Sequence, residues 1–402
     1  MLAGCRPLPV VEVTFHEALG RVLAEEITAE ADDPPAPKSA MDGFALRAAE
    51  TRGTAPERPT PFAFDEVVGA GRLPRGKAGE GRAVRIMTGA LLPEGADAVV
   101  KQEDTHHAGE GRFEVLQPLT EGENVVAAGA RIAKGERMFS EGDLITPAAL
   151  GLLAGLGRSR LRVRKRPRVA LLAVGDELVE VGQPLTPGRL HVSNLYALAA
   201  LVARYGGEPV PLGIAGDDPE AIESRLRPVL PLDGGAAEPC DIALTLGGSH
   251  RGDFDFAHRV LESVGADIHF RRTRINLGGS TLFATLGATL LFGLPGTPVP
   301  SWGAFELLVR PALWKLAGRT HLEHPVFQAR LTQPLAATAG RTCFAPAWLA
   351  PSGEGPPAVT PLKERGESGL PPSLLANALI QVPEGKEELA AETLVAAAWL
   401  GG

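Results

Sequence analysis

Cysteine is scarce in this chain of 402 residues, and its three cysteines are scattered. Cys5, Cys240 and Cys343 make an odd number of thiols and show no zinc-binding spacing. A disulfide framework and a zinc finger are therefore excluded, and a reducing compartment is indicated.

The chain also lacks a long apolar run and an excess of positive charge. Its longest apolar stretch, residues 148–156, covers half of a membrane span, and the N-terminus has no long apolar core of the secretory type. The net charge of -8 is not typical of a nucleic-acid-binding chain. We therefore expect a cytoplasmic protein without nucleic-acid or membrane partners, in which local donors hold any anionic ligand.

Several catalytic motifs are missing as well. The sequence contains no Walker motif, no nucleophile elbow and no His/Cys pair at metal spacing. Four histidines stand apart from such patterns and are expected to be exposed: His106, His107, His250 and His258.

The composition is that of a globular protein, because 44% hydrophobic and 22% charged residues leave no sign of disorder. A chain of this length is expected to form two to four domains. The patterns predict an N-terminal and linker domain over 1–45 and 131–166, a small β domain over 46–130, an α/β domain over 167–318 and a C-terminal β domain over 319–402. The expected fold class is α/β plus β, a multidomain subunit with a central doubly wound α/β domain.

Local patterns predict elements outside the α/β domain. Apolar residues at helical spacing predict an amphipathic helix over 10–26 and an apolar helix over about 147–156. The arginine-rich segment 160–168 is expected to be a solvated turn.

The α/β domain gives the clearest signal. Apolar runs at 171–174 and 242–246 alternate with helical patterns, which indicates a parallel sheet covered on both faces. Ser193 or Asn194 is expected to cap one helix, and Asp218 caps the next. Ligands of such sheets bind at the carboxyl ends of the strands, so the chemistry is expected where the apolar runs end.

Glycines and carboxylates follow these strands. The glycine turn at 247–252 precedes a helix predicted over 255–264, an arrangement that suits a phosphate or another oxyanion but also occurs merely to make a turn. The carboxylates near the strand ends are Asp176, Glu177, Asp217, Asp253 and Asp255. They either hold a hard cation such as Mg²⁺ or serve as caps and turn residues, and the sequence leaves both interpretations open.

Five motifs in order carry a resemblance over nearly the whole chain. They are SAMDGFA at 39–45, RIMTGA at 85–90, PEGADAVV at 93–100, GDEL at 175–178 and LPG at 294–296. Together they resemble the molybdopterin molybdenumtransferase family, which includes the E domain of gephyrin. The resemblance implies an elongated homodimer of four-domain subunits. It also implies that adenylated molybdopterin is bound, that its pyrophosphate is hydrolysed with Mg²⁺, and that molybdate is inserted with release of AMP.

The resemblance also implies roles for individual residues. Asp42 and Thr88 would face the pterin site across the dimer cleft, and Glu177, Asp217 and Asp255 would be the metal ligands. The expected catalytic residues are Asp42, Glu177, Asp217 and Asp255, and the expected substrate-binding residues are Thr88, Gly247, Gly248, Ser249, His250, Arg251, Gly252, Asn276, Gly278, Pro295 and Gly296.

The chain departs from the family pattern in its anion-binding loops. The family usually has KPGKP or RPGKP where this chain has NLGGS at 276–280, so Asn276 and Gly279 stand at two positions that are usually cationic. Arg131 occupies a position that is usually acidic. Replacement charge could come from His250, Arg251, Arg271, Arg272 or Arg274.

Two classes of function therefore stay open. The first is the transferase, with the molybdopterin adenylyltransferase and cofactor-accepting apo-enzymes as further expected partners. The second is a non-catalytic homologue that binds molybdopterin or a partner protein as a carrier or scaffold. A nucleotide- or pterin-processing enzyme of another specificity is a third option. Positive charge near Gly278 in the folded site distinguishes the transferase, which needs it, from the carrier or scaffold.

Overall fold

The computed structural model describes residues 1–232, 238–248, 256–338, 340–353, 355–362, 375–382 and 384–401. The chain divides into two compact units. The first unit comprises Met1–Glu25, Glu141–Leu152 and Arg158–Gly402, and the second comprises Glu26–Ser140 and Leu153–Gly157.

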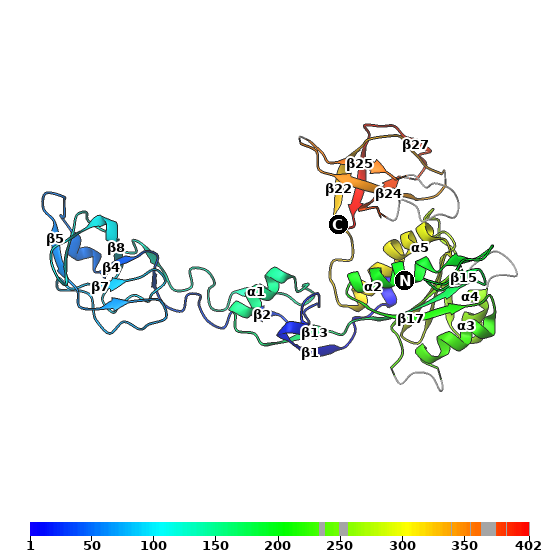
Figure 1. Cartoon of the computed structure of the whole chain (residues 1–402), viewed down its shortest axis with the longest axis horizontal. Coiled ribbons are helices and arrows are strands. Elements are labelled where there is room, and N and C mark those ends of the chain that lie inside the picture. The colour runs from blue at the N-terminus through cyan, green and yellow to red at the C-terminus, as the bar shows by residue number, and fades with distance from the viewer. Residues whose placement is uncertain are drawn as a thin grey trace. The chain divides into compact units, whose positions relative to one another are not determined.

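A six-stranded sheet forms the centre of the first unit (Figure 1). Its order is β17 (Glu208–Ala215), β14 (Arg168–Val174), β18 (Ile242–Leu246), β21 (Thr289–Leu294), β20 (Leu282–Leu286) and β19 (Asp267–Phe270). The first four strands are parallel, which confirms the predicted strands at 171–174 and 242–246. However, β20 is antiparallel to both of its neighbours. Only Gly287 and Ala288 separate it from β21, and so short a connection makes a hairpin rather than a crossover.

Helices cover both faces of this sheet, as expected of a doubly wound domain (Figure 1). One face carries α2 (Ser193–Arg204), α5 (Pro298–Ala304), the π-helical turn η6 (Phe305–Val309) and α6 (Arg310–Leu316), and the other carries α3 (Pro219–Leu226) and α4 (Phe256–Ser263). Successive residues of β14 alternate between the two cores, because Leu171 packs in the same cluster as Leu198 and Leu172 in the same cluster as Ile222.

The helix caps were predicted with mixed success. Asp218 caps α3 as expected, since its side chain accepts a hydrogen bond from the Ala221 backbone N–H at 2.8 Å. The cap predicted at Ser193 or Asn194 is wrong, because Val192 occupies the N-cap position of α2 and provides no side-chain bond.

The N-terminal segment differs from its prediction. Instead of a helix over 10–26, strand β1 (Val10–Thr14) pairs antiparallel with β13 (Arg160–Arg164). The β-branched run of β1 favours a strand, and only the residues after it show helical spacing. The prediction of a solvated turn over 160–168 is also wrong, because this segment contains β13.

The second unit consists mainly of short strands. A four-stranded sheet has the order β6 (Val67–Val68), β7 (Val84–Ile86), β4 (Gly43–Leu46) and β8 (Ala98–Lys101), and a three-stranded sheet has the order β5 (Thr60–Ala63), β10 (Arg112–Val115) and β9 (Thr105–His107). Phe44 of one sheet stacks on Phe113 of the other, with ring centroids 3.9 Å apart, so one aromatic core joins the two sheets. The predicted apolar helix is confirmed as α1 (Pro147–Gly155).

A closed barrel follows the α/β domain, as the fold class predicts. Its strands are β22 (Val326–Leu331), β25 (Ala358–Pro361), β24 (Cys343–Ala350), β26 (Ala378–Val382) and β28 (Leu394–Trp399). Leu331, Ala347 and Ile380 are fully buried inside it. Among the described residues of the whole chain, none of the helices is long and apolar enough to cross a membrane.

A buried charged cluster connects the last helices of the α/β domain to the segment before the barrel. Glu306 is only 2% exposed, and its carboxylate accepts a hydrogen bond from the Tyr205 hydroxyl at 2.8 Å. Its Oε2 lies 3.1 Å from His324 Nε2 and 3.3 Å from Arg310 Nε. Burial lowers the pKa of Arg310, and burial together with Glu306 raises the pKa of Tyr205. The Glu306 side chain is therefore the shared partner of Tyr205, Arg310 and His324, and the buried cluster depends on it.

Replacing Glu306 by alanine should destabilise the α/β domain by about 3–5 kcal/mol, because Arg310 would stay buried without its counter-charge. Urea unfolding followed by tryptophan fluorescence measures this, since Trp314 lies beside Arg310. The control is Glu323→Ala, an exposed carboxylate that also acts on Arg310, with an expected change below about 0.5 kcal/mol. Equal effects of the two substitutions would contradict a specific role for Glu306.

Candidate functional site

The strand register brings three turns together at one edge of the sheet. Ala173 pairs with Leu246, and Leu246 pairs with Leu294, so β14, β18 and β21 end side by side. We call this the carboxyl edge. The candidate residues Gly247, Gly248, Pro295 and Gly296 follow directly after these ends, as expected.

Two glycines touch at the carboxyl edge. A Cβ atom on Gly247 would lie 2.4 Å from the backbone oxygen of Val174, and Gly247 has a φ of 103°. A Cβ atom on Gly296 would lie 3.4 Å from the Gly247 Cα. The two turns therefore pack backbone against backbone, which leaves peptide groups rather than side chains at the base of the site.

A first cavity, of about 270 Å³, opens beside these turns. We call it the glutamate cavity, because Glu177 is the only carboxylate among its described lining residues. Ser193, Asn194 and His191 also line it, and the Asn194 side-chain amide donates a hydrogen bond to the Gly296 carbonyl at 2.5 Å. Sequence reasoning treated Asn194 as a helix cap, so its contact with the site was missed.

A second cavity, of about 410 Å³, lies on the other side of Gly296. We call it the edge cavity. Its lining residues are Arg272, Thr273, Asn276, Gly279, Ser280, Pro295, Gly296, Thr297, Pro300 and Arg341. This set contains two guanidinium groups and no carboxylate, so the cavity presents positive charge. Gly296 lines both cavities, which makes them neighbours.

The Asn276 side chain has a structural partner. Its amide nitrogen donates to the Phe344 carbonyl at 2.8 Å, and its oxygen accepts from the Phe344 backbone N–H at 2.7 Å. The backbone N–H of Thr342 also donates to the Arg274 carbonyl at 3.0 Å. These bonds hold the start of β24 against the 272–280 loop and place Arg341 at the edge cavity.

Not every residue predicted for this loop faces the edge cavity. Gly278 packs against Ala304 of α5, and the next residue, Gly279, lines the cavity instead. Of the arginines expected to replace the missing charge, Arg272 lines the cavity, whereas Arg271 lies 3.3 Å from Glu262. Arg341 was missed, because sequence spacing gives no signal that a barrel residue meets this loop.

The carboxylates at the strand ends are brought together in part. The Asp217 backbone N–H donates to Asp176 Oδ1 at 3.1 Å, and the Asp176 backbone N–H donates to Asp217 Oδ2 at 3.4 Å. These bonds join the turns after β14 and β17. Glu177 follows Asp176 directly and lines the glutamate cavity. No group of three His, Cys, Asp or Glu side chains that could hold a metal occurs among the described residues.

Some predicted positions cannot be placed. Ser249, His250, Arg251, Gly252 and Asp255 lie outside the described residues. The related expectation that His258 is exposed is wrong: it is 9% exposed, and its Nε2 lies 3.1 Å from Glu262 Oε1 on the same helix.

Asp42 and Thr88 pair with each other in the second unit. Asp42 Oδ1 accepts hydrogen bonds from the Thr88 backbone N–H at 2.7 Å and from the Thr88 hydroxyl at 2.8 Å. These two bonds lower the pKa of Asp42, and Arg85 adds a smaller effect. The pair therefore presents an ionised, exposed carboxylate on the turn before β4.

Three family models match successive parts of the chain. The "MoeA N-terminal region (domain I and II)" matches residues 1–157, the "Probable molybdopterin binding domain" matches 170–315, and the "MoeA C-terminal region (domain IV)" matches 328–399. The glutamate cavity is lined by residues of the second matched region, and the edge cavity by residues of the second and third.

Curated and solved relatives agree with these matches. The molybdopterin molybdenumtransferase of Staphylococcus aureus (strain MSSA476) is 33% identical over 326 residues, which are 81% of this chain and 76% of that protein. The molybdopterin molybdenumtransferase of Bacillus subtilis (strain 168) is 35% identical over 77% of this chain and 71% of its own. The crystal structure of the molybdopterin biosynthesis moeA protein from Pyrococcus horikoshii OT3 superposes with a TM-score of 0.83 at 28% identity, covering 99% of this chain and 97% of its own.

Replacing Thr88 by valine should raise the pKa of Asp42 part of the way back to its ordinary value. The substitution removes the hydroxyl bond and keeps the larger contribution, the backbone bond. In the native protein the low pKa keeps Asp42 charged until the pH falls through that value, so the variant should take up the proton at a higher pH. A carboxyl-carbon NMR titration measures this. Thr88→Ser keeps the hydroxyl and should keep the low value; equal titrations of the two variants would refute the assigned contact.

Proposed function

This chain belongs to the molybdopterin molybdenumtransferase family, and we propose that it inserts molybdate into adenylated molybdopterin with release of AMP at the carboxyl edge. As a family member it is a transferase of molybdenum cofactor biosynthesis. One observation carries the placement of the reaction: Gly296 lines both a cationic cavity and a cavity whose described lining contains a single carboxylate. Such a pair of neighbouring cavities suits an oxyanion beside an uncharged ring system.

The edge cavity is the proposed oxyanion site. Arg272 and Arg341 can each donate two hydrogen bonds to a tetrahedral oxyanion, and guanidinium groups are well matched to such geometry. Ser280 and Thr297 add hydroxyl donors on the same lining. Molybdate and the phosphates of the nucleotide share this chemistry, so both can be held near Gly296.

The glutamate cavity is the proposed place of the pterin. Glu177 can accept hydrogen bonds from ring N–H groups, and Ser193 offers a hydroxyl on the same lining. Asn194 fixes the Gly296 turn and so determines the distance between the two cavities. In this arrangement the side chains bind and orient the substrate, and the carboxyl edge supplies backbone donors.

Magnesium is proposed as the divalent cation, bound by only a few carboxylates of the protein. Magnesium often takes one or two carboxylates and completes its shell with water and substrate phosphates. The paired carboxylates Asp176 and Asp217, together with Glu177, fit that smaller role; Asp255 remains a proposed ligand outside the described residues. When bound, the ion would neutralise phosphate charge during hydrolysis of the pyrophosphate.

The second unit is proposed to complete the site in a homodimer. Asp42 keeps an ionised carboxylate at an exposed turn and needs a partner surface to act on substrate. We propose that it faces the carboxyl edge of a second copy. A cytoplasmic location, the molybdopterin adenylyltransferase and apo-enzymes that accept the cofactor are further parts of this proposal.

The carrier or scaffold alternative is not favoured by the site. It was based on the loss of cationic residues at positions 276 and 279. Arg272 and Arg341 supply two positive charges to the same cavity, and the Asn276 amide is used by Phe344. The charge needed to capture an oxyanion is therefore present.

Replacing Arg341 by glutamine should raise the molybdate concentration for half-maximal insertion. A lost charge-assisted hydrogen bond is worth roughly 1–3 kcal/mol, or about a 5- to 150-fold change. Insertion is followed by AMP release and by transfer of the cofactor to an apo-enzyme. The control is Arg330→Gln on the barrel, where Arg330 pairs with Glu392, and it should keep the native requirement. An unchanged requirement in Arg341→Gln would place molybdate elsewhere.

The protein should be a dimer at micromolar concentration, because Asp42 and the carboxyl edge are proposed to meet across two copies. Light scattering should give twice the mass of one chain. An inactive Asp42→Ala variant mixed with an inactive Arg272→Gln/Arg341→Gln variant should regain activity, since one of the two sites in a mixed dimer is intact. A monomeric mass, or no recovery on mixing, would contradict the shared site.

A further inference from the structure

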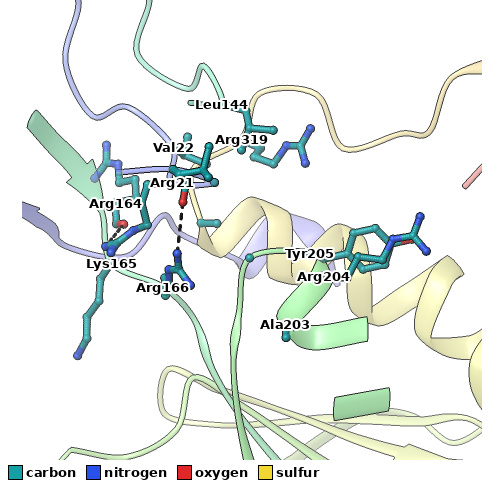
Figure 2. Close-up of a pocket in the computed structure, with 14 residues that line it drawn as sticks. Arg21, Val22, Leu144, Arg164, Lys165, Arg166, Ala203, Arg204, Tyr205 and Arg319 are labelled. Atoms are coloured by element: carbon teal, nitrogen blue, oxygen red, sulfur yellow. Dashed lines mark hydrogen bonds between the residues drawn. The ribbon is translucent and has the colours of Figure 1, made fainter. Parts of the chain in front are cut away.

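A third cavity lies at the opposite end of the sheet, where β14 and β17 begin. Its volume is about 260 Å³, and it is formed by the turn at 19–22, the residues after β13 and the ends of α2 and α6 (Figure 2). Its charged lining residues are Arg21, Arg164, Lys165, Arg166, Arg204 and Arg319. Among the described residues that line it, there is no aspartate and no glutamate. We call it the arginine cavity.

Two of the six cations have carboxylate partners. Arg164 pairs with Glu141, and Lys165 pairs with Glu238. Figure 2 shows the Lys165 side chain pointing away from the other labelled cations. Carboxylates of the protein therefore already compensate the positive charges of these two residues.

The other four cations have neutral partners only. Arg21, Arg166 and Arg204 donate to the backbone carbonyls of Arg164, Leu19 and Leu400, at 2.9, 3.4 and 2.8 Å. Arg319 stacks over the Trp314 ring at 3.7 Å. None of the four lies within ion-pair distance of a carboxylate among the described residues. Carbonyl oxygens satisfy N–H groups but do not cancel a positive charge.

Two of these cations, Arg21 and Arg319, are also partly withdrawn from water. The Nε atom of Arg21 is buried without a hydrogen-bond partner. Burial lowers the pKa of Arg21 and the like charge of Arg166 lowers it further, whereas the charge of Glu17 opposes both effects. Such a concentration of positive charge in a chain with a net charge of -8 attracts anions locally. A bound anion would relieve the repulsion between these like charges.

We propose that the arginine cavity binds a small phosphate-bearing anion at a site separate from the carboxyl edge. Arginine forks match phosphoryl oxygens, and a cavity of about 260 Å³ has room for one or two phosphoryl groups. One or two phosphoryl groups therefore fit better than an acidic peptide. Free pyrophosphate and the phosphate of a nucleotide share this chemistry. The site does not depend on the function proposed for the carboxyl edge.

Calorimetry with inorganic pyrophosphate on the full chain tests this proposal. The Arg272→Gln/Arg341→Gln variant serves as background, so that the edge cavity contributes as little as possible. In this background, adding Arg166→Gln and Arg319→Gln should weaken pyrophosphate binding at least tenfold. Adding Arg166→Lys, which keeps the charge, should weaken it less than the glutamine substitution. A parallel titration with AMP identifies the source: tighter binding of AMP assigns the site to a nucleotide, and tighter binding of pyrophosphate assigns it to the free anion.

The matched control is Lys165→Gln, which removes one positive charge from the same lining and should leave affinity within about twofold. Equal losses in Lys165→Gln and Arg166→Gln would overturn the proposal, because they would show a general effect of charge. It is also overturned if the background variant binds neither pyrophosphate nor AMP. Binding of polyglutamate without binding of pyrophosphate would overturn it in favour of an acidic protein segment.

Discussion

The close approach of Gly247 and Gly296 is the constraint on which the carboxyl edge depends. The parallel register of β14, β18 and β21 ends the three strands side by side, and Gly247 fits between the turns because a Cβ atom there would lie 2.4 Å from the Val174 carbonyl oxygen. Because Gly296 also lines both cavities, the same contact sets the separation between the proposed oxyanion and pterin positions. A side chain at Gly247 would therefore disturb both cavities at once.

Positive charge is distributed unevenly over an acidic chain. The edge cavity and the arginine cavity lie at opposite ends of the parallel strands, and both linings lack carboxylates. At the carboxyl edge the cations come from two parts of the first unit, Arg272 from the α/β domain and Arg341 from the barrel. The Asn276 side chain joins these parts by pairing with the Phe344 backbone. A lysine at position 276 could not accept the Phe344 N–H, so the departure from the family pattern has a structural explanation.

Local chemistry explains what the sequence predicted well. Buried parallel strands produce uninterrupted apolar runs, so the strand at 242–246 was located correctly, and Asp218 carries its cap signal within one turn. The helix expected over 10–26 was wrong, because pairing with β13, about 150 residues away, overrides local spacing. Arg341 and Asn194 were missed for a similar reason: their contacts depend on the packing of distant elements. The two-residue hairpin before β21 was also not foreseen.

We propose that the edge cavity, which Arg272 and Arg341 line, holds the oxyanion that becomes part of the cofactor. Anomalous X-ray scattering at the molybdenum edge, from crystals of the full chain grown with adenylated molybdopterin and soaked in molybdate, tests it most directly. If the edge cavity is the oxyanion site, we expect a molybdenum peak inside it, within hydrogen-bonding reach of both guanidinium groups and beside Gly296. A peak at the arginine cavity alone, or an edge cavity that stays empty while the pterin is bound, would contradict it.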